Sequence, residues 1–240
     1  MSEHEWPVLL WDNGLDLIAL LFFLACFKGY LYYTSRKSTS TPCLAFAMHR
    51  FRKQWIRVAL KRENRIADTN IVANLERNVS FFASTSILVL AGLLTLLTSS
   101  ESVMSMLSDI PFSDHSSRGE WEVKVLLLVL MFIYAFFKFT WALRQFGLVS
   151  VMIGGAPEPV DHPSAAETRR HVDSITRMAS KASGNFNSGL RTYYFSMAAL
   201  AWFVNAWFFM ALSALVVVVL YRREFKSDTL AIMMEDLPKA

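Results

Sequence analysis

The sequence is poor in cysteine and lacks the short motifs that mark common catalytic and metal sites. Its two cysteines, Cys26 and Cys43, are too few for a disulfide framework. The five histidines are scattered without an H-x-x-x-H or C-x-x-C pair, and no phosphate-binding glycine loop or G-x-S-x-G motif occurs. We therefore expect no catalytic residue, no metal site and no cofactor, and we expect that the protein is not an enzyme.

Charge is scarce as well: charged residues make up 18% of the chain and hydrophobic residues 54%, which is unusual for a soluble protein. The hydrophobic residues gather in four blocks separated by polar stretches. Each block has the roughly 20 apolar residues that a helix needs to cross a bilayer, and an open strand cannot satisfy its backbone there. The sequence predicts a single all-α membrane domain with four spans, at about 13–33, 80–98, 123–143 and 193–221.

The first block could instead be a signal peptide, which needs a basic start and a small-residue cleavage site. The chain begins with the acidic MSEHEW, and TSRKSTSTP follows the block where an A-x-A pattern would be needed. We therefore expect the first block to be retained as a span.

Charges between the blocks predict the orientation. The loop 34–79 carries ten Lys and Arg residues against three acidic ones, whereas the loop 99–122 carries five acidic residues and only Arg118. Positive loops stay in the cytoplasm, so the loop 34–79 is predicted to lie inside and the loop 99–122 outside. With four spans, both termini then lie outside. The basic segment YRREFK after the last block conflicts with this. The cytoplasmic loops account for the net charge of +4, which favours contact with an anionic inner leaflet over nucleic acid.

No proline and only one glycine, Gly92, interrupts residues 44–98. We predict one long helix there, or two nearly coaxial ones, whose part 44–79 extends about 50 Å into the cytoplasm. The third span likewise continues past Lys138 and Arg144 until the glycines and prolines at 154–159. The segment 144–192 is then cytoplasmic, with an amphipathic helix at 164–183 followed by a linker, SGNFNSG.

Polar residues of these extensions form a predicted interface, made of Arg57, Arg62, Glu63, Asn64, Arg65, Asp68, Lys138 and Arg144. Like charges four residues apart weaken an isolated helix by roughly 0.2–0.5 kcal/mol per pair, so a partner should compensate them. Anionic headgroups or a packed polar helix could be that partner, and a solvated charged face is an equally good interpretation. In the packed arrangement, Arg144 would lie near Glu63 or Asp68.

Asn205 lies mid-way along the fourth block, between two tryptophans. An amide in hydrocarbon needs a hydrogen-bond partner, and such a bond is worth about 0.6–2 kcal/mol. We predict an intramembrane polar contact that ties the fourth span to a neighbouring helix, in preference to a role in lining a pathway or a cofactor site.

The segments KRENRIADTNI, FFASTSILVLAGL, KFTWALRQF and YYFSMAALAWFVNAWFFM resemble a family of bacterial and plant membrane proteins known as domain of unknown function five-nine-nine. The resemblance covers nearly the whole chain in the expected order. It implies a four-span membrane protein and no particular activity. We expect the protein to lie in the bacterial cytoplasmic (inner) membrane.

Three functions are left open. The first is a non-enzymatic homo-oligomer held together by the polar interface, with a channel or transport-like role as one form of it. The second is an accessory or scaffold subunit that uses the same face to bind an unknown membrane partner. The third is a membrane enzyme acting on lipid, with Glu63 and Asp68 as acid–base groups, although the sequence supplies no nucleophile or metal site for it.

Overall fold

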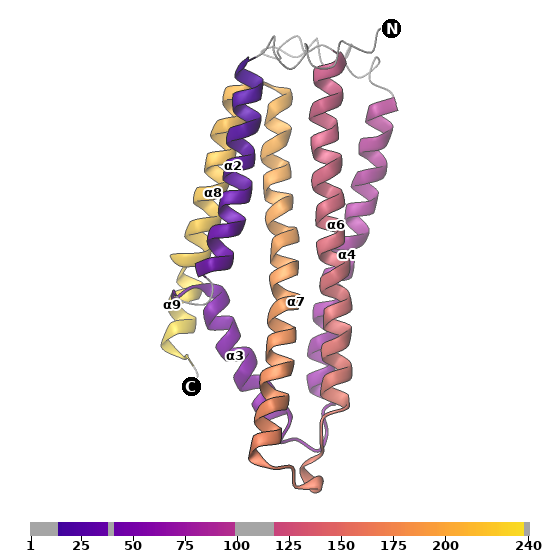
Figure 1. Cartoon of the computed structure of the whole chain (residues 1–240), viewed down its shortest axis with the longest axis vertical. Coiled ribbons are helices and arrows are strands. Elements are labelled where there is room, and N and C mark those ends of the chain that lie inside the picture. The colour runs from indigo at the N-terminus through magenta and orange to yellow at the C-terminus, as the bar shows by residue number, and fades with distance from the viewer. Residues whose placement is uncertain (1–13, 38–40, 99–117, 238–240) are drawn as a thin grey trace. The chain divides into compact units, whose positions relative to one another are not determined.

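The computed structural model describes residues 14–37, 41–98 and 118–237, and all regular structure in these ranges is helical (Figure 1). The α-helices are α2 (Gly14–Lys37), α3 (Leu44–Ala59), α4 (Ile66–Thr98), α6 (Arg118–Gly154), α7 (Ala165–Leu200), α8 (Ala206–Phe225) and α9 (Asp228–Glu235), with 3-10 turns η1 (Pro159–Asp161) and η2 (Ala201–Phe203). Four stretches are long and apolar enough to cross a membrane: Gly14–Lys37, Ile66–Thr98, Arg118–Gly154 and Ala206–Glu235. The prediction of an all-α, multi-pass membrane protein is confirmed. Most of the loop 99–122, on which the predicted orientation partly rests, lies outside the described residues.

Contacts divide the chain into two compact units. Unit 1 comprises Met1–Ser35, Thr85–Ala135 and Leu190–Tyr221, and unit 2 comprises Arg36–Ser84, Phe136–Gly189 and Arg222–Ala240. Three separate segments of the chain thus belong to unit 1. The second and the third are each preceded and followed by a segment of unit 2. Unit 1 therefore contains five helical segments: α2, the end of α4, the start of α6, the end of α7, and α8.

Aromatic side chains fill the core of unit 1. The ring of Phe23 on α2 lies 5.9 Å from that of Phe195 on α7 and 5.0 Å from that of Phe209 on α8, measured between centroids. All three side chains are fully buried. Because lipid is as apolar as these rings, their packing stabilises the bundle through van der Waals contact more than through removal from water.

Helices α2 and α8 run parallel within unit 1. Near their starts, Trp202 donates a hydrogen bond from Nε1 to Asp16 Oδ1 at 2.7 Å. Near their ends, the rings of Tyr33 and Tyr221 lie 6.3 Å apart. Both helices therefore leave unit 1 at the same end.

The block 193–221, predicted as one span, is divided between two helices of opposite direction. Helix α7 ends at Leu200, the turn η2 follows, and α8 begins at Ala206. The end of α7 runs antiparallel to α2, because Arg191 donates to Thr34 Oγ1 at 3.1 Å near the end of α2. Helices α7 and α8 form a hairpin that closes at 201–205, a reversal that no proline or glycine marks.

The predicted rod over 44–98 is also interrupted. Helix α3 ends at Ala59 and α4 begins at Ile66, and Trp55 Nε1 donates to Asp68 Oδ1 at 2.8 Å. Residues 13 positions apart would be separated by about 20 Å along one helix. The chain therefore folds back between α3 and α4, which are not coaxial, while α4 itself runs unbroken from Ile66 to Thr98.

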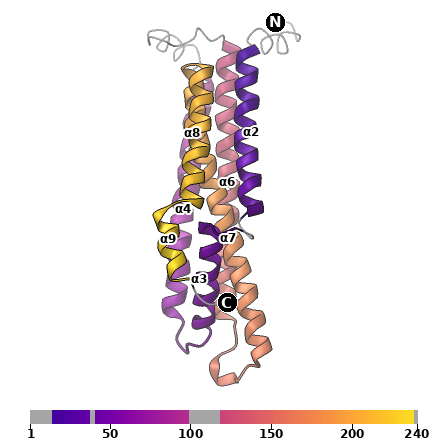
Figure 2. The same cartoon turned by 90° about the vertical axis from the view of Figure 1, so that its left-hand side faces the viewer.

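Unit 2 joins segments that are distant in sequence. Helix α3 packs against α9 (Figure 2). At the start of α3, the N-cap residue Cys43 offers no side-chain cap, and the backbone N–H of Ala45 instead donates to Glu224 Oε1 at 3.1 Å. A carboxylate is well suited to this place, because the first N–H groups of a helix lack intrahelical acceptors. The end of the described chain thus caps a helix near its beginning.

Helix α7 contains the predicted amphipathic helix 164–183, with Val172, Ile175 and Ala179 on its buried side. It does not stop at the predicted linker SGNFNSG but continues through it to Leu200. One glycine of this stretch, Gly189, is required by packing. A Cβ at this position would lie 2.7 Å from Cζ of the buried Phe139 ring on α6. The glycine marks close packing between helices.

Candidate functional site

The predicted polar interface is organised around one carboxylate, that of Asp68 in the first turn of α4. Asp68 is fully buried, and its Oδ1 accepts hydrogen bonds from Trp55 Nε1 and Arg62 Nη1, both at 2.8 Å. Arg62 is 46% exposed, and the buried Oδ2 of Asp68 accepts no hydrogen bond from the described residues. The ion pair and the indole fix the reversal between α3 and α4. These partners all belong to the same chain.

Arg65 links the same turn to the carboxyl end of α6. Its guanidinium donates to the backbone carbonyls of Ile153 at 2.9 Å, Ala156 at 2.8 Å and Pro157 at 2.6 Å. The last carbonyls of a helix have no intrahelical partner, and a cation beside them also complements the helix dipole. Arg65 therefore serves the internal structure of unit 2.

The structure records no contact of Arg144 with the Asp68 cluster, which consists of Trp55, Arg62 and Asp68. Its side chain is exposed on α6, and it forms no ion pair with Glu63 or Asp68 within the described ranges. The next residues, Gln145 and Phe146, are the side chains that α6 buries at this level. One helix cannot direct all three consecutive side chains inward, so Arg144 faces outward.

The other predicted residues around the turn, Arg57, Glu63 and Asn64, form no recorded hydrogen bond or ion pair with one another. Arg57 is half-buried in the last turn of α3, and Glu63 is exposed in the turn itself. Asn64 is exposed too, and its Oδ1 accepts from the backbone N–H of Ile66 at 2.9 Å, which helps to start α4.

Lys138 belongs to a different polar chain, between α6 and α7. Its Nζ donates to Asn185 Oδ1 at 3.2 Å, and Asn185 Nδ2 donates to Gln145 Oε1 at 2.8 Å. Gln145 is buried. Sequence reasoning singled out the lysine but missed both amides, because Asn185 was assigned to a linker.

Asn205 is a helix cap. Its Oδ1 accepts from the backbone N–H of Phe208 at 2.7 Å, which is the geometry of an N-cap at the start of α8. The predicted contact with a neighbouring helix is therefore replaced by a local one. Asparagine is among the preferred N-cap residues, and this was the one signal in the sequence for the reversal at 201–205.

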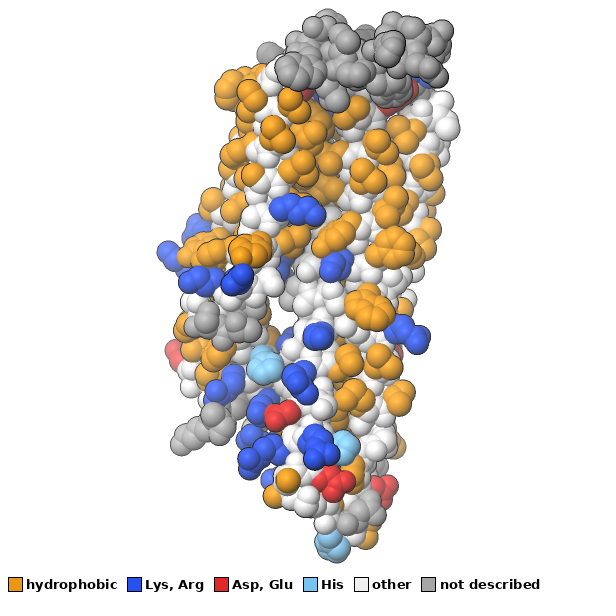
Figure 3. Space-filling view, viewed as in Figure 1, with side chains coloured by type: hydrophobic (Ala, Val, Ile, Leu, Met, Phe, Trp, Pro, Cys, Tyr) orange, Lys and Arg blue, Asp and Glu red, His pale blue; other side chains and the backbone are white. Residues whose placement is uncertain are grey.

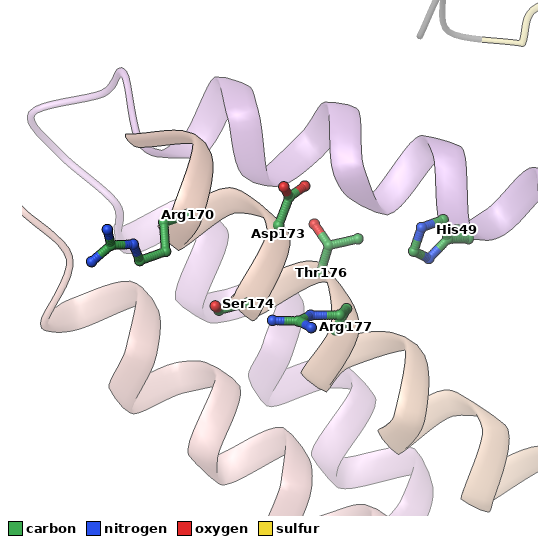
Figure 4. Close-up of a pocket in the computed structure, with 6 residues that line it drawn as sticks. All are labelled: His49, Arg170, Asp173, Ser174, Thr176 and Arg177. Atoms are coloured by element: carbon green, nitrogen blue, oxygen red, sulfur yellow. The ribbon is translucent and has the colours of Figure 1, made fainter. Parts of the chain in front are cut away.

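A cavity of about 410 Å³ lies between α3 and α7 in unit 2 (Figure 4). None of the residues singled out from the sequence lines it. Its wall consists of His49 on α3 and five residues of α7: Arg170, Asp173, Ser174, Thr176 and Arg177. Beside it, Lys53 Nζ lies 2.8 Å from Asp173 Oδ1, and His49 Nδ1 lies 2.9 Å from Ser180 Oγ. Thr176 is buried, and its hydroxyl has no hydrogen-bond partner among the described residues.

Positive charge dominates the surroundings of this cavity. Burial lowers the pKa of His49, and Arg52, Lys53 and Arg50 lower it further, while Asp173 opposes them. Burial also lowers the pKa of Arg52, to about 10, which leaves it a cation at neutral pH. The hydrogen bond from Lys53 lowers the pKa of Asp173, so this carboxylate stays ionised.

The arrangement suits an anion better than a metal ion. Among residues 14–37, 41–98 and 118–237, no three His, Cys, Asp or Glu side chains gather in a way that could hold a metal. The cavity wall contains guanidinium and hydroxyl donors, and its carboxylate is already paired with Lys53. Such donors bind carboxylate or phosphate oxygens. The sequence signal for this site was the spacing of Arg170 and Arg177 on one face of a helix.

Comparison with known proteins identifies the family. The family model described as "Protein of unknown function, DUF599" matches residues 18–229, a range that includes parts of both units. No curated protein and no solved structure matches the chain. The match confirms the resemblance seen in the sequence, and the chain belongs to the DUF599 family of proteins of unknown function.

Proposed function

We propose that this chain is a non-enzymatic multi-pass protein of the bacterial cytoplasmic membrane, with unit 1 in the bilayer and unit 2 in the cytoplasm. In this proposal, unit 2 binds a negatively charged ligand or partner. The function is one of recognition at the inner face of the membrane.

The segregation of charge carries the proposal. Of the described residues, unit 2 has 19 Lys and Arg against 11 Asp and Glu, whereas unit 1 has 4 against 3. Basic side chains gather over α3 and the first half of α7 (Figure 3). Positive segments flanking spans are retained in the cytoplasm. Unit 2, with the larger excess, is therefore the cytoplasmic one.

An odd number of passes would agree with the charges at the carboxyl end. Arg222 and Arg223 follow directly after unit 1, and Glu224 caps α3 in unit 2. We infer that the end of α7 adds a fifth pass to the four stretches that are long and apolar enough to span a membrane, which would put the amino terminus outside and the carboxyl terminus inside. This proposal differs from the expectation of two outside termini, and it would remove the conflict with YRREFK.

Enzyme chemistry at the inner face has weaker support. A lipid-cleaving role would need Glu63 and Asp68 as acid–base groups facing one substrate. Asp68 is buried against Trp55 and Arg62, while Glu63 is exposed in the turn. A conduit through one protomer is also disfavoured, because aromatic rings fill the core of unit 1.

Labelling of single cysteines in intact cells tests the five-pass arrangement. In a chain without its native cysteines, Lys226→Cys after α8 and Arg170→Cys on α7 are expected to resist a membrane-impermeant maleimide until the cells are permeabilised. Ser113→Cys, in the acidic segment between α4 and α6, is the matched outside control and should react at once. If position 226 reacts in intact cells as position 113 does, the carboxyl terminus is outside and the proposal fails.

Self-association is a second candidate function, favoured by the outer face of α4 in unit 2. Asn70, Ile71, Asn74 and Leu75 are exposed there, and Ile71 is 44% exposed. Amide side chains both donate and accept hydrogen bonds, so the same face on two copies can pair about a twofold axis. This face lies on α4 next to the predicted interface; on it Asn74 also accepts a hydrogen bond from Arg77 of the same helix.

Disulfide crosslinking in native membranes tests this candidate. In the cysteine-free background, Asn74→Cys is expected to give a covalent dimer on mild oxidation, whereas Arg169→Cys on the exposed side of α7 is not. Absence of the Asn74→Cys dimer, with one stoichiometric foreign protein recovered from the same membranes, would favour the accessory-subunit function instead.

A further inference from the structure

We propose that the cavity between α3 and α7 is a binding site for a phosphate group, carried by a water-soluble phosphate ester or by a lipid headgroup. The inference deepens the proposed function, because it rests on unit 2 facing the cytoplasm and names the chemistry that unit 2 recognises.

Two arginines on one face of α7 supply the principal donors. Arg170 and Arg177 are seven residues apart, which is two helical turns and about 10.5 Å along the axis, and they stand on either side of Ser174 (Figure 4). Both are exposed, and the structure records no hydrogen bond or ion pair for either of them within the described residues. A guanidinium matches two phosphate oxygens at once and stays charged at every physiological pH.

The acidic group in the wall does not oppose an anion. Asp173 lies between the arginines in sequence, and Lys53 holds it at 2.8 Å. Arg177 also helps to lower the pKa of Asp173, but Lys53, Arg170 and Arg177 together carry two more charges than this one carboxylate. Two cations beside a balanced pair fit the two negative charges of a phosphate monoester.

Hydroxyl groups of the wall provide the second set of donors. The hydroxyl of Thr176 is buried and has no partner in the described parts of the chain, although buried polar groups are nearly always hydrogen-bonded. The hydroxyl of Ser174 lies on the same wall. His49 closes the α3 side, where its bond with Ser180 orients the ring. A buried hydroxyl without a partner in the wall of this cavity indicates a missing acceptor.

The size of the cavity favours a phosphate carried by a small molecule or headgroup over a bare ion. Its volume of about 410 Å³ falls in the range of about 300–1,000 Å³ typical of small-ligand sites. The same donors would bind the phosphate of a soluble ester or of a lipid headgroup, so the binding experiment must use probes that distinguish these two sources.

Titration of the intact protein in nanodiscs of zwitterionic lipid tests the proposal. Glycerol 3-phosphate and inorganic phosphate are the soluble probes, with chloride at equal ionic strength as the reference, and calorimetry reports binding. Saturable binding of glycerol 3-phosphate is expected, weakened at least about tenfold by Arg170→Ala and by Arg177→Ala, because each removes a charge-assisted contact. Arg169→Ala, which removes an exposed arginine outside the wall, should leave the affinity unchanged.

A second variant separates binding from folding. Thr176→Val keeps the shape of the side chain and removes the unpaired hydroxyl, so the apparent unfolding temperature should hold or rise while the affinity for glycerol 3-phosphate falls. If only anionic-lipid vesicles bind, and the same two arginine variants weaken that binding, the phosphate comes from a headgroup. Absence of binding to every probe, or binding insensitive to Arg170→Ala and Arg177→Ala, would overturn the site. The cysteine labelling would still stand, because it reports only on topology.

Discussion

The variant Arg62→Ala is expected to destabilise unit 2 by about 3 kcal/mol, although the arginine is 46% exposed. Its partner is the reason. Asp68 is fully buried, and without Arg62 its charge would be left with a single hydrogen bond, from Trp55. Removing one partner of a buried pair typically costs about 3–5 kcal/mol; the value here lies at the lower end because water reaches the arginine. The measurement is the unfolding transition of the detergent-purified protein.

A double variant distinguishes this cause from a general loss of arginine packing. In Arg62→Ala combined with Asp68→Asn, the uncharged amide can still accept the Trp55 hydrogen bond, so most of the lost stability should return. Arg57→Ala removes a half-buried arginine of α3 that is not bonded to Asp68, and it should change stability by less than about 1 kcal/mol. Equal destabilisation by Arg57→Ala and Arg62→Ala would mean that the buried carboxylate is not the cause.

The variant Gly189→Ala is expected to destabilise unit 2 by about 1–3 kcal/mol, against the usual preference for alanine in helices. The new methyl would lie 2.7 Å from Cζ and 2.8 Å from Cδ1 of Phe139. That ring cannot move aside easily, because it is fully buried and packs against Phe82 and Phe186 at centroid distances of 5.6 and 5.8 Å. A lower apparent unfolding temperature is the expected observation.

Helix α7 contains a matched control for this prediction. A Cβ at Gly184 would meet nothing within 4 Å, so Gly184→Ala should stabilise the protein by up to about 1 kcal/mol through helix propensity. Replacing the ring in Phe139→Leu should remove the clash, so that Gly189→Ala lowers stability less in that background. If the two glycine variants behave alike, close approach of α6 and α7 at Gly189 is not limiting.

Hydropathy was sufficient to predict that the chain is helical and spans a membrane several times. The spans depend on runs of about 20 apolar residues, and that signal is independent of tertiary contacts. The two reversals of the chain could not be predicted in the same way. Neither the turn between Ala59 and Ile66 nor the one at 201–205 contains proline or glycine. The first is held by Trp55 and Asp68, a contact that exists only after folding.

Prediction of the site was partial for a similar reason. The polar residues chosen from the sequence include Asp68 and Arg62, because a carboxylate among many cations is visible as a pattern, but they do not include Trp55. The hydrogen bonds from Arg65 to carbonyls at the end of α6 could not be predicted, because backbone acceptors are present at every residue and leave no pattern in the sequence. Asn205 was read as an intramembrane polar group when its position also fitted an N-cap. In each case the polar side chain could bond either another side chain or the backbone at a helix end, and only the path of the backbone decided which.

The cap that Glu224 provides for α3 affects the order in which the protein can be made. Its hydrogen bond with Ala45 joins residues separated by 179 positions, and α9 adds further contacts with the same helix. Translation supplies the chain from its amino terminus, so α3 is synthesised long before its cap and its neighbour exist. Unit 2 can therefore complete its packing only after α9 has been synthesised, and truncation after Tyr221 would leave α3 without its cap and without its neighbour.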